Sequence, residues 1–286
     1  MSDGVRHPAV AGRFYPGDAD ILSRDVKSYV LPDKSPDIPA DQAAVRPANQ
    51  QKISALGCVV PHAGYMYSGY VAGAVYGALN IPKHVLILGP NHTGAGHPLA
   101  IMSEGAWETP LGAAQIDSAL AQELLKRFAL LGEDAEAHRT EHAIEVQLPF
   151  LQTLQPGFNF VPITIGTSQL EVLTALGLVL ADVISKQPEP VMIVSSSDMN
   201  HYENDPITRI KDQKAIDRIL ALDAKGLSEA VRAEHISMCG VEPTVVMLTA
   251  VKKLGAESAQ LVKYATSGDI SGDRQRVVGY AGITVQ

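Results

Sequence analysis

Three short apolar runs each end in a turn that carries a histidine, and this arrangement limits the possible folds more than any other feature. The runs cover residues 57–60, 85–88 and 191–194, and the histidines that follow them are His62, His92 and His201. Short apolar runs of this kind are typical of strands buried on both faces of a parallel sheet. Neighbouring parallel strands would bring the three imidazoles to one carboxyl edge, where open α/β sheets bind ligands.

Strand-like and helical stretches alternate along the rest of the chain. This alternation predicts one α/β domain over residues 1–286, a three-layer α/β/α sandwich with a mostly parallel or mixed central sheet. The main predicted helices cover residues 20–30, 68–79, 118–130, 141–154, 170–184, 207–220, 227–233 and 244–254. The main predicted strands cover residues 54–60, 84–88, 160–165, 191–194, 260–266 and 277–285, with a turn or hairpin at 107–112 and a surface loop at 32–51.

Composition excludes several classes of protein. The formal net charge of -8 provides no basic field for phosphates, so we expect no nucleic-acid partner. The apolar runs are too short for a membrane span, and residues 1–7 do not resemble a signal peptide. Two cysteines are too few for a disulfide framework. We therefore expect a soluble, acidic, cytoplasmic protein.

His62 and His92 form the strongest candidate pair for metal binding. Each follows an apolar run and precedes small residues that leave room for a ligand. Imidazole is the commonest protein ligand for transition metals. The alternative is that each is a loop histidine bonded to backbone carbonyls. Because two histidines follow equivalent strands, the sequence alone leaves both the metal site and the loop histidines as interpretations.

Cys239 is a candidate for either metal binding or nucleophilic catalysis. It lies just ahead of a predicted helix with Pro243 in its first turn. A thiol near a helix N-terminus has a lowered pKa and is available as thiolate. The alternative is a small, buried, apolar side chain. For Cys58, inside an apolar strand, we prefer that alternative.

Two further segments carry polar groups that suit proton transfer. Asp198 and His201 leave a strand together, so His201 could act as a general acid or base and Asp198 could orient a histidine or bind metal. An Asp N-cap or Asx turn is the alternative for Asp198. In the second segment, Thr140 is predicted to cap a helix that carries His142 between two glutamates. This helix presents either an active-site face or a solvated one.

The chain resembles the Memo family, whose prokaryotic members are also called AmmeMemoRadiSam system protein B, along nearly its whole length. The matching motifs, in order, cover residues 7–16, 61–69, 88–92, 107–112, 141–145, 196–202 and 238–240. The family is similar in fold to the class III, LigB-like extradiol dioxygenases. Those enzymes hold non-haem iron(II) through two histidines and a carboxylate.

The resemblance implies a role for each candidate residue. His62 and His92 match the two histidine ligands of the dioxygenases, and Cys239 falls where those enzymes have the carboxylate. His201 matches their catalytic base, and His142 matches their second active-site histidine. A thiolate in place of a carboxylate softens the site, so copper or zinc becomes an alternative to iron(II), which the resemblance favours. It also puts ring cleavage in question.

Three functions follow from these assignments, and whether the protein is an enzyme is left open. The first is a metal-dependent oxidoreductase acting on a small aromatic or related substrate. The second is a non-catalytic binding or scaffold protein that holds a peptide or metabolite in a vestigial dioxygenase cleft. The third makes Cys239 the nucleophile of a hydrolase or transferase, activated by His201. The family name implies an AMMECR-type protein and a radical SAM enzyme as partners.

Overall fold

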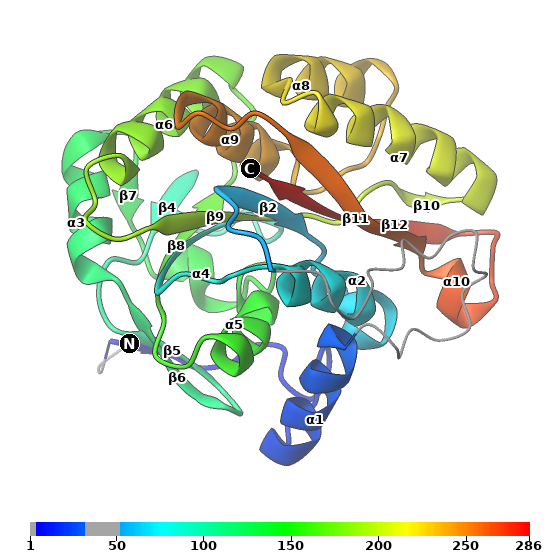
Figure 1. Ribbon diagram of the computed structural model, residues 1–286, viewed down its shortest axis with the longest axis horizontal. Helices are drawn as coiled ribbons and strands as arrows, with labels where there is room; N and C mark the ends of the chain where they lie inside the picture. Colours follow the sequence, from blue (N-terminus) through cyan, green and yellow to red (C-terminus); the bar gives the residue numbers. More distant parts are fainter. Residues whose placement is uncertain (1–3, 32–51) are drawn as a thin grey trace.

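A mixed β-sheet forms the middle layer of the molecule, and helices cover both of its faces (Figure 1). The computed structural model describes residues 4–31 and 52–286, so the loop predicted at 32–51 lies outside the described residues. The three-layer α/β/α sandwich predicted from the sequence is confirmed. Within the described residues, no helix combines the length and the apolar character needed to cross a bilayer.

The strands are β1 (Val5–Arg6), β2 (Gly57–Val60), β3 (His84–Pro90), β4 (Leu99–Ile101), β5 (Ala106–Thr109), β6 (Gly112–Ile116), β7 (Gly132–Glu133), β8 (Asn159–Ile165), β9 (Val191–Ser196), β10 (His201–Glu203), β11 (Ala259–Thr266) and β12 (Val277–Val285). The helices are α1 (Ala19–Val30), α2 (Tyr65–Ala78), α3 (Ser118–Arg127), α4 (Glu136–Arg139), the 3₁₀ helix η1 (Glu145–Gln147), α5 (Leu148–Leu154), α6 (Leu170–Ile184), α7 (Asp205–Leu220), α8 (Ala224–Ala233), α9 (Val241–Lys253) and α10 (Gly268–Ser271).

The centre of the sheet is parallel. Strands β8, β3, β9 and β2 lie side by side in this order and run in the same direction, and β12 then pairs with β2 in the opposite direction. The carboxyl ends of β2, β3 and β9 therefore meet at one edge of the sheet. The three apolar runs therefore predicted correctly that these strands are neighbours in a parallel sheet.

The central strands are buried on both faces, which explains their continuous apolar sequences. Along β3, Leu86 and Leu88 belong to the core that contains side chains of α3, α6 and α9. Val85 and Ile87 belong to the core on the opposite face, which contains side chains of α1, α2 and α5. Cys58 on β2 lies fully buried in this second core, as expected of a small apolar side chain.

Most predicted elements are present, with two corrections near the candidate site. The helix over Leu170–Ile184 and the hairpin of β5 and β6 are found as predicted. The first is a short strand, β1, which is absent from the predicted strands and pairs with β5. The second concerns the helix predicted over 141–154, which is wrong in its first part, because α5 begins only at Leu148.

Candidate metal centre

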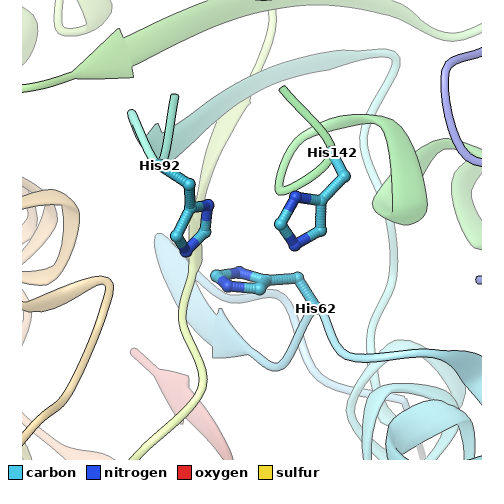
Figure 2. Close-up of side chains that lie close together, drawn as sticks. All are labelled: His62, His92 and His142. Carbon is cyan, nitrogen blue, oxygen red and sulfur yellow. The ribbon is translucent and has the colours of Figure 1, made fainter. Parts of the chain in front are cut away.

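Three imidazoles converge at the carboxyl edge of the sheet. His62 follows β2, His92 follows β3, and His142 lies in the loop between α4 and η1. Their candidate ligand atoms all lie within 4.8 Å of one another. Figure 2 shows the three rings facing one another, with centroid separations of 4.8 to 5.4 Å. A set of imidazoles in this arrangement suits zinc, copper, iron or nickel.

Tertiary hydrogen bonds replace the predicted first turn of the helix that was to carry His142. The Arg6 side chain donates to the backbone carbonyls of His138 (2.6 Å) and Glu141 (2.7 Å). The backbone N–H groups of His142 and Ala143 donate to the Glu141 carboxylate, so they are not available for helical hydrogen bonds. Thr140 is the C-cap residue of α4, and the prediction that it caps a following helix is wrong. The interruption turns His142 toward His62 and His92.

Glu141 orients two of the three histidines, a role that the sequence did not reveal. Its buried carboxylate accepts hydrogen bonds from His92 Nδ1 (2.9 Å) and from the backbone N–H groups of His92 (2.6 Å), His142 (2.8 Å) and Ala143 (2.9 Å). The bond to Nδ1 leaves the Nε2 lone pair of His92 available for a metal. Carboxylate–histidine pairs of this kind are the usual support of histidine ligands in metal sites.

The electrostatic surroundings keep two of the three imidazoles neutral. Burial, together with the neighbouring His92, lowers the pKa of His62 to about 3. Burial and the neighbouring His62 lower the pKa of His142 to about 4. Burial also lowers the pKa of His92, but the hydrogen bond and the charge of Glu141 outweigh it and raise the value above the usual one. His62 and His142 are therefore neutral at neutral pH, the form in which imidazole binds metal.

Cys239 lies beside the histidine cluster. Its Sγ is 3.1 Å from His62 Nε2, and the backbone N–H of Asp198 donates to it at 3.3 Å. Its place ahead of α9 is as predicted, but the expected lowering of its pKa is wrong. Burial and the nearby Asp198 raise the pKa of the Cys239 thiol well above its usual value, because both disfavour the thiolate. The thiol therefore needs a cation nearby to ionise.

Asp198 shapes the turn that carries His62. Its Oδ1 accepts hydrogen bonds from the backbone N–H groups of His62 (2.8 Å) and Ala63 (3.3 Å). Burial raises the pKa of this carboxyl. Asp198 thus fixes the backbone of His62, whereas the His62 ring contacts Ser196 and Cys239.

His201 stands apart from the three clustered histidines. Its ring Nδ1 lies 2.8 Å from the backbone carbonyl of Ser237, and its backbone N–H donates to Ser237 Oγ at 2.8 Å. Because a carbonyl only accepts, Nδ1 carries the hydrogen, and Nε2 is the basic position of the neutral ring. This tautomer suits a group that takes up a proton.

Fold and site together define an α/β protein with a histidine cluster at the carboxyl edge of its central sheet. The family model described as Memo-like protein matches residues 6–284. The chain belongs to this family.

Relatives and a solved structure agree with this assignment. The chain is 43% identical over 283 residues to a MEMO1 family protein from Methanopyrus kandleri, covering 97% of this chain and 98% of the relative. A MEMO1 family protein from Ignicoccus hospitalis is also 43% identical, over 98% of both chains. The crystal structure of an uncharacterized protein from Escherichia coli K12 superposes with a TM-score of 0.51 at 15% identity, covering 80% of this chain and 98% of that chain. This last likeness shows the fold alone and is consistent with the predicted LigB-like fold.

Proposed function

We propose that this Memo-family protein is a metal-dependent oxidoreductase that acts on a small aromatic or related substrate. The observation that carries the proposal is the convergence of His62, His92 and His142, whose ligand atoms lie within 4.8 Å of one another. Iron(II) is the preferred metal, with copper or zinc as alternatives. An iron(II) ion with open coordination positions would supply the activation of dioxygen and substrate.

In this proposal, His62 and His92 are metal ligands and Cys239 is the third. The distance of 3.1 Å between Cys239 Sγ and His62 Nε2 supports Cys239, because one cation can contact both atoms. His142, in the loop between α4 and η1, lies close to the same two histidines. There it either completes the ligand set or contacts the substrate. His201 moves protons through Nε2, and Asp198 holds the turn of His62.

The contact between Cys239 and His62 supports a second candidate function, although the group of ligand atoms within 4.8 Å of one another contains the three histidines and not Cys239. If all three histidines and Cys239 bind one ion, the four donors complete a closed tetrahedral site, which is typical of structural zinc. The protein would then be a non-catalytic scaffold that binds a peptide or metabolite. The third possibility, a Cys239 nucleophile activated by His201, has less support, because the thiol contacts His62 and its pKa is raised.

Elemental analysis after anaerobic purification tests the metal site. We expect one transition-metal ion per chain in the wild type and its loss in His92→Ala. The matched control is His84→Ala, because His84 also pairs with a carboxylate, Asp117, but at the opposite end of β3. Metal retained in His92→Ala, or a well-folded wild type that binds no added metal, would refute the proposal.

Two ligand variants separate the oxidoreductase from the scaffold. For an open site with Cys239 as third ligand, Cys239→Ser weakens binding of Fe²⁺ far more than His142→Gln does. For a closed site, the two variants weaken binding of Zn²⁺ to a similar extent, and this result would favour the scaffold. From the family resemblance we further propose an AMMECR-type protein and a radical SAM enzyme as partners, to be tested by co-purification of the full chain with each.

A further inference from the structure

Ser196 lies at the centre of a hydrogen-bond network beneath His62. Its Oγ is 2.6 Å from the backbone carbonyl of Ala143, 2.9 Å from Gln147 Nε2 and 3.0 Å from His62 Nδ1. Ser196 and Gln147 are both fully buried, so water does not compete for these contacts. The network joins β9 to η1 and to the turn after β2, which are the elements that flank the cluster.

The direction of each hydrogen bond in this network follows from its carbonyl acceptors. Gln147 Nε2 lies 3.0 Å from the Pro61 carbonyl, so the amide nitrogen must face it, while Gln147 Oε1 accepts from the Tyr76 hydroxyl. The single hydroxyl hydrogen of Ser196 is directed at the Ala143 carbonyl. The Ser196 oxygen can then only accept, both from Gln147 and from His62.

His62 must therefore carry its hydrogen on Nδ1. The lone pair of its neutral ring is then on Nε2, the atom that lies 3.1 Å from Cys239 Sγ. In the metal-free protein the Cys239 thiol has two acceptors within reach, this lone pair and the Asp198 backbone carbonyl at 3.7 Å. The opposite tautomer would place an N–H where a metal ion has to bind, and it would leave Ser196 and His62 without their hydrogen bond.

We propose that Ser196, held in place by Gln147, is a positioning residue that fixes His62 in the Nδ1–H tautomer and so presents Nε2 to the metal. The statement about metal rests on the proposed function. The statement about the tautomer does not, since it concerns the metal-free protein.

The tautomer is measured by long-range ¹H–¹⁵N correlation NMR of the metal-free protein labelled on the histidine rings. We expect His62 to be protonated at Nδ1 in the wild type and to shift toward the Nε2–H form in Ser196→Ala. The matched control is Ser195→Ala. Ser195 directly precedes Ser196 in β9 and is equally buried, but it pairs with Thr244 Oγ1 at 2.9 Å instead. An Nε2–H ring in the wild type, or an unchanged ring in Ser196→Ala, would overturn the proposal.

Metal affinity is measured on the same proteins by titration with Zn²⁺ in competition with a chromophoric chelator. Loss of a partner that orients a ligand typically weakens binding about 10- to 100-fold, which we expect for Ser196→Ala but not for Ser195→Ala. Gln147→Met, which removes the amide without removing Ser196, should also lower the metal affinity. Equal affinity of Ser196→Ala and wild type would overturn the positioning role. A wild type with the expected tautomer but no affinity for metal would instead refute the proposed function.

Discussion

Glu141 lies in the loop after α4 and Glu145 is the first residue of η1, and both carboxylates are buried, but their partners differ. Glu145 is paired with the Arg6 guanidinium at 2.7 Å and also accepts from the Tyr15 hydroxyl and from two backbone N–H groups. Glu141 instead accepts from the His92 ring and from backbone N–H groups. The fixed cation of Arg6 compensates the Glu145 carboxylate. The Glu141 carboxylate is bonded to an imidazole whose other nitrogen faces the cluster. The difference separates a structural anchor from a support of the candidate metal site.

The largest effect should come from removing the fixed cation. Arg6→Met leaves the Glu145 carboxylate buried without its partner, which typically costs about 3–5 kcal/mol in the free energy of unfolding. Urea denaturation of the metal-free protein measures this loss. The control is Arg139→Met, because Arg139 pairs with Glu136 at an exposed site, where a salt bridge contributes about 0–1 kcal/mol. Similar losses in the two variants would show that Glu145 does not depend on its cation.

A smaller effect should distinguish the two carboxylates in metal binding. Glu141→Gln weakens the acceptor of the His92 ring, and we expect metal affinity to fall about 10- to 100-fold. Glu145→Gln should lower the free energy of unfolding but leave the affinity close to that of the wild type. Chelator competition with Zn²⁺ measures both variants. If Glu145→Gln weakens metal binding as much as Glu141→Gln, the division between anchor and support fails.

The smallest effect, for each residue and each pH unit, is the pH dependence of the metal-free protein. The folded-state pKa values of His62, His138 and His142, about 3, 3 and 4, lie below the usual value of 6.5, mainly because of burial. Between pH 4 and 6.5 the unfolded chain therefore binds more protons at these histidines, so their contribution to stability falls as the pH falls through this window. His92 has a raised pKa and acts in the opposite direction.

Buried carboxyl groups act in the opposite direction to these three histidines, because burial raises the pKa of Asp212 to about 7, so the contribution of one histidine is measured by comparing the wild type with a variant. Each histidine contributes at most about 1.4 kcal/mol per pH unit. Urea denaturation at a series of pH values measures the slope, and His142→Gln should reduce it. Equal slopes in the wild type and in His142→Gln would contradict this prediction.

The sequence predicted those parts of the site that follow from strands. Continuous apolar runs identified β2, β3 and β9, and the turns after β2 and β3 placed His62 and His92 correctly at one edge. The start of α1 is also a local feature, because Asp18 caps the helix by accepting from the nearby backbone N–H of Ile21.

The supporting contacts were not predictable, because they join residues far apart in the sequence. Arg6 contacts the carbonyl of Glu141, which lies 135 residues away, and this contact replaces the expected helical turn. The pairing of His62 with Ser196 spans 134 residues. The segment of His142 predicted a helix with either an active-site face or a solvated one, and only the family resemblance assigned His142 to the site. Periodicity in the sequence reports burial, but it does not report which distant group satisfies a buried polar atom.

The run of serines at the end of β9 has a consequence for insertions and deletions. The residues of β9 before Ser195 are apolar and buried, so a slip of one position would still put apolar side chains into both cores. A neighbouring serine would also take the place of Ser196 below His62. The place of Asp198, however, would pass to Ser197 or Met199, and the backbone N–H groups of His62 and Ala63 would lose their acceptor. A shift of one position in this strand would therefore remove the acceptor that holds the turn of His62.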